Sequence, residues 1–279
     1  MKIQKSKQIE SFKEHLQNEE KSPNTIKKYL NDICSFTLWV GEREITKQLV
    51  LEYKAYLKEN FAVASVNSKL SSLNSFFSFC GEDSLKIKLI KMQRQIFTKK
   101  EKELTRGEYE RLLLAAKRKE NRRLYYLMQT ICSTGIRVSE LRFITVKSLE
   151  ERRAHINCKG KHRIVILPDK LCRMLKQYIK ERKISSGAVF VTKNGNPLDR
   201  SNICHDMKKL CDSARVPREK VFPHNLRHLF ARTYYSIQKD IVRLADILGH
   251  SSVNTTRIYT MESGEVHRTQ IQKLGLLIS

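Results

Sequence analysis

The sequence lacks several features that define large classes of proteins. No run of apolar residues reaches the roughly 18 that a membrane-spanning helix needs, so no transmembrane segment is expected. The N-terminus, Met1–Lys5, is charged and has no apolar segment behind it, which argues against a signal peptide. The seven cysteines are scattered, odd in number and free of C-x-x-C pairs. They therefore predict reduced cytosolic thiols rather than disulfides or a zinc site.

Acidic residues are also scarce. Asp and Glu number 29 against 54 Lys and Arg, which gives a formal net charge of +25 over 279 residues. Such an excess attracts polyanions, and neutralising the phosphates of a nucleic acid releases condensed counterions. Nucleic acid is therefore the first partner to consider, because a membrane surface would explain the charge and nothing else. The length is sufficient for two domains, each with its own core.

Residues 1–85 predict a small helical domain. Ser22-Pro23 is a helix start, because serine caps free N–H groups and proline fits the first turn. Another helix is expected to begin at Thr46, and a further one to end near Gly81, each with apolar residues at three- and four-residue spacing. With one helix before Ser22 they make four, which is enough for a bundle.

A basic linker and a larger domain follow. Residues 86–102 hold seven basic residues and one acid, which fits either a solvated charge run or a strap along a DNA backbone. In residues 103–279, Lys159-Gly160-Lys161 separates two short strand-like runs as the tip of a hairpin. Helices are predicted to start at Thr105, capped reciprocally by Glu108, and to cover residues 169–183, 198–213, 224–236 and 240–248. The whole chain is expected to be mainly α with a small β-hairpin (α+β).

Five polar side chains of the larger domain stand out by type and order. Arg137 follows a glycine that ends a helix, and Arg227, His250 and Tyr259 follow His224 at +3, +26 and +35. Tyrosine can attack a phosphodiester, arginine can bind its phosphate, and histidine can move a proton or donate a hydrogen bond. Taken singly each residue has an ordinary explanation, such as a surface ion pair for Arg137. Their joint order is what favours chemistry.

In this order the residues resemble the tyrosine recombinases, a family that includes phage integrases and Xer-type recombinases. The resemblance lies in Arg137 within the segment TGIRVSEL, in His224 and Arg227 as H-x-x-R, in His250 after Leu-Gly, and in Tyr259 nine residues later. The N-terminal helices are similar to the core-binding, SAM-like domain of that family. The resemblance thus covers nearly the whole chain and implies a core-binding domain followed by a catalytic domain.

The resemblance implies strand transfer through a covalent 3′-phosphotyrosine, without metal or other cofactor. Tyr259 is then the nucleophile, which releases a 5′-hydroxyl from the DNA strand. Arg137 and Arg227 bind the non-bridging phosphate oxygens and stabilise the charge of the transition state. His224 is the base for the phenol, and His250 donates a hydrogen bond to the phosphate.

The acid for the leaving 5′-oxygen is a hairpin lysine in this family. Its Lys-Gly context assigns Lys159, and Lys161 is the alternative because the turn is one residue shorter than the family's usual pattern. We also expect Lys161 to contact DNA, together with Lys28 and Lys69 of the first domain.

The resemblance further implies double-stranded DNA with paired recombination sites as the partner, and four protomers assembled on it. The apolar residues after Gly264 are interpreted as a tail that docks in trans on a neighbouring protomer, with packing on its own domain as the alternative. A cytoplasmic, nucleoid-associated protein of bacterial or archaeal type is expected. A type IB topoisomerase and a non-catalytic DNA-binding regulator are the competing functions.

Overall fold

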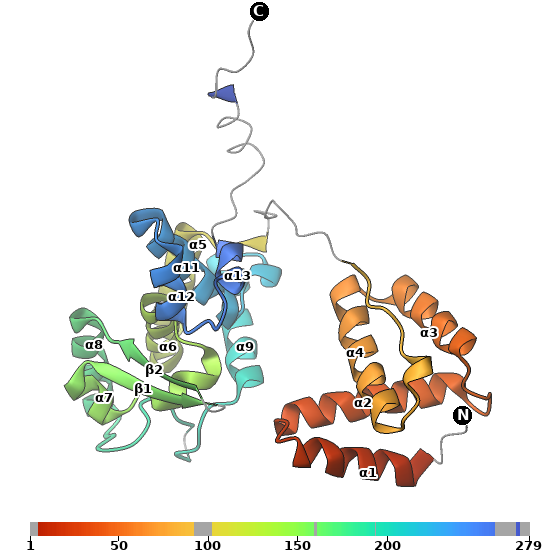
Figure 1. Cartoon of the computed structure of the whole chain (residues 1–279). Coiled ribbons are helices and arrows are strands. Elements are labelled where there is room, and N and C mark those ends of the chain that lie inside the picture. Colours follow the sequence, from red (N-terminus) through yellow and green to blue (C-terminus); the bar gives the residue numbers. More distant parts are fainter. Residues whose placement is uncertain (1–4, 92–101, 159–160, 193, 260–271, 274–279) are drawn as a thin grey trace, which may run out of the picture. The chain divides into compact units, whose positions relative to one another are not determined.

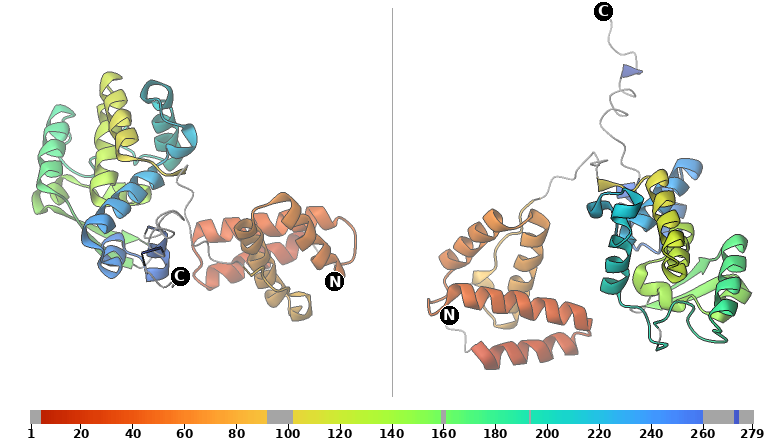
Figure 2. Two further views of the ribbon diagram at one scale, coloured as in Figure 1. Left: turned by 90° about the horizontal axis from the view of Figure 1, so that it is seen from above. Right: turned by 180° about the vertical axis from the view of Figure 1, so that it is seen from behind.

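The computed structural model describes residues 5–91, 102–158, 161–192, 194–259 and 272–273. The chain divides into two compact units, Met1–Arg94 and Gln95–Ser279 (Figure 1; Figure 2). Most described residues are helical and the described strands form one two-stranded sheet, so the expected mainly α chain with a small hairpin is confirmed.

The described part of the first unit holds four helices and a short 3₁₀ turn. These are α1 (Lys5–Asn18), α2 (Pro23–Val40), α3 (Lys47–Asn60), α4 (Val63–Phe79) and η1 (Asp83–Leu85). The predicted helix starts are confirmed, because the hydroxyls of Ser22 and Thr46 accept hydrogen bonds from the backbone N–H groups of Thr25 and Leu49. The apolar helix faces meet in a core that includes Phe12, Ile33, Phe36, Leu70, Leu73, Phe76 and Phe77.

The second unit is built around helix α6. Its described elements are α5 (Arg106–Arg118), α6 (Arg122–Thr134), η3 (Val138–Phe143), α7 (Val146–Glu151), β1 (Arg153–Cys158), β2 (Lys161–Ile166), α8 (Asp169–Glu181), α9 (Arg200–Lys208), α10 (Cys211–Ala214), η4 (Arg218–Lys220), α11 (Pro223–Gln238), α12 (Ile241–Leu248), α13 (Val253–Thr256) and η5 (Arg257–Tyr259). Helix α6 contacts α5, α8 and α11, and the hairpin contacts α7 and η3 (Figure 1). The buried side chains of Leu127, Met128 and Ile131 place α6 in the core.

Two predicted boundaries around α5 and α6 are confirmed in detail. The Thr105 hydroxyl accepts a 3.2 Å hydrogen bond from the Glu108 N–H, and the Glu108 carboxylate accepts one of 2.8 Å from the Thr105 N–H. Gly135 ends α6 in the left-handed region, with φ +64°. A Cβ at this position would lie 2.5 Å from the ring of Phe230, so glycine is needed both for the turn and for the contact of α6 with α11.

The hairpin has the predicted position. Strands β1 and β2 are antiparallel, and Arg153 pairs with Ile166 at one end and Cys158 with Lys161 at the other. The two residues between Cys158 and Lys161 lie outside the described residues. Lys161, which was expected in the turn, is instead the first residue of β2.

The helix predicted over residues 198–213 is interrupted. Asp199 caps α9, which ends at Lys208, and the chain turns before α10 begins at Cys211. Met207, Leu210, Cys211 and Ala214 are all buried, so the apolar spacing continues across the turn. Spacing alone therefore predicted one helix where the backbone forms two.

Candidate active site

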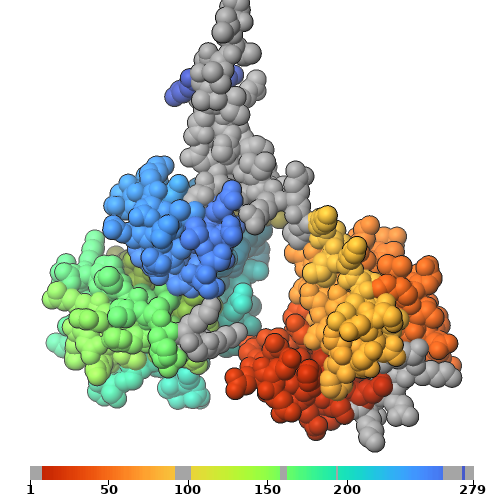
Figure 3. Space-filling model, viewed as in Figure 1, coloured from red at the N-terminus to blue at the C-terminus, as the bar shows by residue number. Residues whose placement is uncertain are grey.

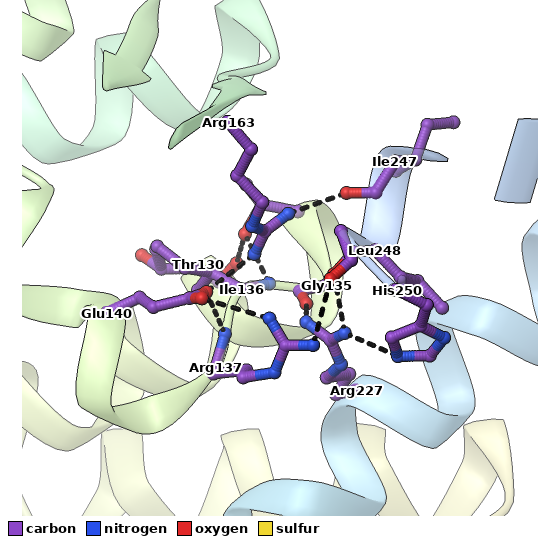
Figure 4. Close-up of polar contacts among 12 residues, drawn as sticks. Thr130, Gly135, Ile136, Arg137, Glu140, Arg163, Arg227, Ile247, Leu248 and His250 are labelled. Atoms are coloured by element: carbon purple, nitrogen blue, oxygen red, sulfur yellow. Dashed lines mark hydrogen bonds and ion pairs between the residues drawn. The ribbon is translucent and has the colours of Figure 1, made fainter. Parts of the chain in front are cut away.

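Arg137 lies at the turn that follows α6. It caps the 3₁₀ helix η3, and its own backbone is extended. Its guanidinium donates a 3.0 Å hydrogen bond to Glu140 and a 3.3 Å hydrogen bond to the carbonyl of Gly249 (Figure 4). The side chain of Glu140 is 5% exposed, whereas that of Arg137 is 39% exposed. Arg137 is thus held by a buried carboxylate and a backbone carbonyl while part of its side chain faces solvent, so it is not an ordinary surface ion pair.

Glu140 is the acid that organises this corner. Burial opposes its ionisation, but hydrogen bonds from Arg163 and from the Arg137 backbone keep its pKa below the usual range. The Arg137 N–H donates to it over 2.9 Å and Arg163 Nη2 over 2.5 Å. Glu140 is therefore a carboxylate at neutral pH, shared by two arginines.

Arg227 is fully enclosed at the centre of the site. One terminal nitrogen donates to the carbonyl of Gly135, and the other donates to the carbonyl of Leu248 over 2.8 Å and lies 3.0 Å from His250 Nε2 (Figure 4). Burial, followed by the charge of Arg137, lowers the pKa of Arg227 to about 10. It stays a cation at neutral pH and ties the end of α6 to the end of α12.

His250 follows Gly249, which ends α12 with φ +63°. Burial, followed by the charges of Arg227 and Arg137, lowers the pKa of His250 to about 4, so the ring is neutral at pH 7. Because arginine can only donate, Nε2 of His250 accepts from Arg227, and the proton sits on Nδ1. Nδ1 then donates to the Thr256 hydroxyl over 2.9 Å.

Tyr259 is buried against the two histidine-bearing segments, with 4% of its surface exposed. Its ring meets that of His228 edge-on, with centroids 4.6 Å apart, and stacks on His250 at 6.0 Å. His228 in turn meets His224 at 4.6 Å. Tyr259 acts to raise the pKa of Arg227, against the larger effect of burial, so the phenol and the guanidinium are neighbours.

Five of the residues singled out in the sequence thus gather in one site. They are Arg137, His224, Arg227, His250 and Tyr259, which come from the ends of α6, α11 and α12 and from η5. In Figure 3 the segment of α12 and α13 lies directly against the hairpin segment. The turn with Lys159 lies outside the described residues, and Lys161 is the first residue of β2. Of residues 260–279, all but 272 and 273 also lie outside the described residues.

Two members of the site were missed in the sequence. His228 lies one turn after His224 on α11, so the i, i+4 spacing was an available signal. Arg163 was seen only as part of a strand. It donates to the carbonyl of Ile247, 84 residues further along the chain, and no local pattern predicts such a contact.

The two lysines expected to contact DNA in the first unit share one buried acid. Lys28 lies 2.5 Å and Lys69 3.3 Å from the carboxylate of Asp32, which also accepts a 2.8 Å hydrogen bond from Ser72. The Lys28 side chain is 43% exposed and that of Lys69 22%. Two cations on one carboxylate leave a net positive charge at this face.

Two further observations concern membranes and metals. Within the described residues no helix has the length and apolar character needed to cross a membrane. The same residues contain no group of three or more His, Cys, Asp and Glu side chains arranged to hold a metal ion.

A buried phenol beside guanidiniums and neutral imidazoles, following a separate helical unit, is suited to an enzyme that cuts and rejoins nucleic-acid strands. Comparison with known proteins agrees. Residues 102–265 match the phage integrase family, and residues 9–82 match its N-terminal SAM-like domain. The tyrosine recombinase XerA of Thermococcus kodakarensis is 30% identical over 281 residues, which cover 96% of this chain and 95% of the relative.

Solved structures show the same relationship. The crystal structure of XerA recombinase matches with a TM-score of 0.53 and 26% identity, over 97% of this chain and 99% of that one. XerH site-specific recombinase bound to its difH substrate, at 23% identity, has the same fold, with a TM-score of 0.69 over 91% of this chain and 81% of that one. The chain belongs to the phage integrase family of tyrosine recombinases. It is a site-specific recombinase acting on DNA sites, as the resemblance implied.

Proposed function

We propose that Tyr259 is the nucleophile that cuts the DNA strand. The observation that carries the proposal is the burial of its ring against His228 and His250, beside the Arg227 guanidinium. Attack of the phenol oxygen on phosphorus forms a 3′-phosphotyrosyl bond, and the bond to the 5′-oxygen breaks. A partner strand's 5′-hydroxyl then reverses the step, so the phosphodiester energy is kept and no nucleotide cofactor is needed.

Arg137 and Arg227 bind the two non-bridging oxygens of the scissile phosphate. Arg137 is half-exposed, so it has N–H groups that can face the DNA, and Arg227 is fixed by two backbone carbonyls. Both are held before DNA binds, so the donors need no reorganisation in the transition state. Loss of one such donor typically slows a reaction ~10²–10³-fold.

His224 is the base for the phenol. Burial, followed by the charge of Arg227, lowers its pKa, so the imidazole is neutral at pH 7 and can accept a proton. Its ring contacts His228, which contacts Tyr259, so a proton leaving the phenol has imidazoles close by. The hairpin lysine, Lys159 with Lys161 as the alternative, protonates the leaving 5′-oxygen.

His250 donates a hydrogen bond to the phosphate. In the DNA-free geometry its Nε2 accepts from Arg227, so this role requires the proton to move to Nε2, with Nδ1 then accepting from the Thr256 hydroxyl. A hydroxyl can act as donor or acceptor, so Thr256 serves both tautomers. The imidazole thus stays fixed while its donor atom changes.

The protein acts on double-stranded DNA with paired recombination sites, as four copies on two sites. Support comes from relatives of the same fold, including a lambda integrase tetramer bound to a Holliday junction. Lys28, Lys69 and Lys161 contact the DNA backbone, and the residues after Gly264 dock on a neighbouring copy. A cytoplasmic, nucleoid-associated location follows from this partner and from archaeal relatives such as that of Thermococcus kodakarensis.

Covalent capture tests the nucleophile without knowledge of the DNA site. The protein is incubated with sheared genomic DNA of its source and denatured, and the nuclease-treated product is analysed for a nucleotide on tyrosine. The wild-type chain should carry the nucleotide on Tyr259, and Tyr259→Phe should carry none while still binding DNA. Tyr235→Phe, a partly buried tyrosine beside the same small cluster, is the matched control and should form the adduct. An adduct in Tyr259→Phe would exclude the assignment, and sequencing the captured DNA supplies the site.

A further inference from the structure

Arg163 is the most enclosed cation of the site after Arg227. Its side chain is 12% exposed, and it donates to the Ile247 carbonyl over 2.6 Å and to Glu140 over 2.5 Å (Figure 4). Gly249 makes room for it, because a Cβ there would lie 2.3 Å from Arg163 Cδ. Among the described residues, its Nε is buried without a hydrogen-bond partner. A surface ion pair would not require such an enclosed position.

Arg163 and Arg137 divide one carboxylate between them. Arg137 binds Oε1 of Glu140 through its side chain, and Arg163 binds Oε2 through its side chain. Two cations and one anion leave a net charge of +1 at this corner. Without Arg163 the net charge would be zero, and Oε2 would keep only the Arg137 backbone N–H as a partner, so it could also draw the Arg137 guanidinium into a two-point pair with the acid.

We propose that Arg163 is a positioning residue for strand cleavage. It occupies the second oxygen of Glu140, so this acid orients Arg137 without cancelling the positive charge that Arg137 presents to the phosphate. The inference rests on the proposed role of Arg137 as a phosphate ligand. It assigns Arg163 no contact with DNA, because its guanidinium is enclosed and both terminal nitrogens are engaged.

The competing explanation is that Arg163 only holds β2 against α12. An ion pair of similar burial provides the control for it. Lys220 and Glu108 lie 2.8 Å apart, with side chains 14% and 11% exposed, in a part of the unit that supplies none of the proposed phosphate ligands. Lys220→Met removes one cation from a buried pair there, as Arg163→Met does in the site.

The experiment compares two DNA substrates that carry the captured site. One has the natural phosphodiester at the scissile position, and the other has a methylphosphonate, which lacks the negative charge. Arg163→Met should slow phosphodiester cleavage about 10²-fold and methylphosphonate cleavage far less, because the neutral phosphorus needs less positive charge. The ratio of the two rates does not depend on the fraction of protein that is folded. Lys220→Met should leave this ratio at the wild-type value.

A second substitution tests the charge balance directly. Glu140→Gln in the Arg163→Met background removes the acid that has become unbalanced, so phosphodiester cleavage should recover at least 10-fold over the single variant. A purely mechanical tie would not be restored by removing its partner. A wild-type substrate ratio in Arg163→Met, or a double variant no faster than Arg163→Met, would overturn the proposal.

A third substrate separates the guanidinium's role from that of the hairpin lysine. If a 5′-phosphorothiolate, whose sulfur leaves without an acid, restored Arg163→Met to the wild-type rate, Arg163 would act through the lysine and the proposal would be wrong. No rescue is expected. Absence of any Tyr259 adduct in the wild-type protein would instead contradict the proposed function itself, so the two failures are distinct.

Discussion

The imidazole of His228 meets the phenol ring of Tyr259 edge to face, with centroids 4.6 Å apart and planes inclined at 72°. The His228 ring also meets the ring of His224, with centroids 4.6 Å apart and planes inclined at 76°. Burial, followed by the neighbouring His224 and Arg232, lowers the pKa of His228 to about 4. At neutral pH the proposed nucleophile therefore contacts an uncharged ring that also contacts the proposed base.

Replacing this ring should affect both stability and cleavage. His228→Ala removes two ring contacts, each worth about 0.5–1.5 kcal/mol, and lets the Tyr259 ring change position. We expect a lower free energy of unfolding of the second unit and slower adduct formation. His228→Phe keeps a ring and should retain most of both. Chemical denaturation and single-turnover cleavage measure the two effects, and an Ala variant equal to wild type in both would refute the role given to His228.

The second unit should lose stability in mild acid. The pKa of His228 falls from 6.5 to about 4 on folding, so the unfolded chain binds a proton between these values and the folded chain does not. The contribution of the buried neutral ring is therefore complete above pH 6.5 and is lost as the pH falls towards 4. His250 acts in the same direction, with a pKa of about 4.

Thermal melts across this range test the acid effect. The melting temperature of the wild-type second unit should fall from pH 7 to pH 5, and His228→Phe should show a shallower fall. His162→Phe, at an exposed position of the same unit, should follow the wild-type slope. If the melting temperature of His228→Phe fell with pH as steeply as that of wild type, His228 would not be the buried neutral group that causes the acid effect.

Gly249→Ala should slow cleavage as well as lower stability, because it strains the backbone and also displaces a side chain of the site. The residue has φ +63°, and the new Cβ would meet Arg163 at 2.3 Å, so the Arg163–Glu140 contact must shift. Gly187→Ala is the matched control, with φ +76° and no atom within 4 Å of the new Cβ. Both should lose about 1–2 kcal/mol for left-handed backbone, but only Gly249→Ala should also lose cleavage. The unfolding free energy and the cleavage rate of each variant decide this.

The hairpin lysine can be identified by its leaving group. Lys159→Ala and Lys161→Ala should be compared on a natural substrate and on a 5′-phosphorothiolate. The acid's variant should be slow on the natural substrate and recover on the sulfur one, because thiolate leaves without protonation. We expect recovery for Lys159→Ala only. Recovery confined to Lys161→Ala would move the role to the first residue of β2.

Cleavage should not require a divalent metal. The proposed mechanism assigns the neutralisation of phosphate charge to Arg137 and Arg227, which is the task that metal ions perform in two-metal nucleases. Adduct formation should therefore proceed at the same rate in EDTA and in magnesium. A strict magnesium requirement would contradict the mechanism.

The sequence predicted those features that depend on neighbouring residues. The Thr105–Glu108 cap and the end of α6 at Gly135 are local, because the partners lie three residues apart or the backbone needs a left-handed residue. The place of the hairpin in the chain was predictable for the same reason, but its register was not, because Lys161 was expected in the turn and pairs with Cys158 instead. The break between α9 and α10 was not, because Met207 before it, Leu210 within it and Ala214 after it are all buried and preserve the helical spacing.

The site was predictable as a set of residues but not as a geometry. Ordered motifs named Arg137, His224, Arg227, His250 and Tyr259. They carried no information about the carbonyl of Ile247, which Arg163 reaches across 84 residues of sequence. Nor did they show that Asp32 draws Lys28 and Lys69 together, because that acid lies 37 residues from Lys69. Contacts of this kind follow from packing, which spacing does not encode.

The arginines of the site are held largely by neutral carbonyls at the ends of helices. Arg227 binds those of Gly135 and Leu248, Arg163 binds that of Ile247, and Arg137 binds that of Gly249. These oxygens are neutral, and Glu140 supplies one negative charge for three guanidiniums, so the site keeps a net positive charge and the mutual repulsion that goes with it. An oxyanion bound there relieves that repulsion and, by mass action, favours the folded state. If these arginines bind the scissile phosphate as proposed, DNA binding should therefore stabilise the second unit.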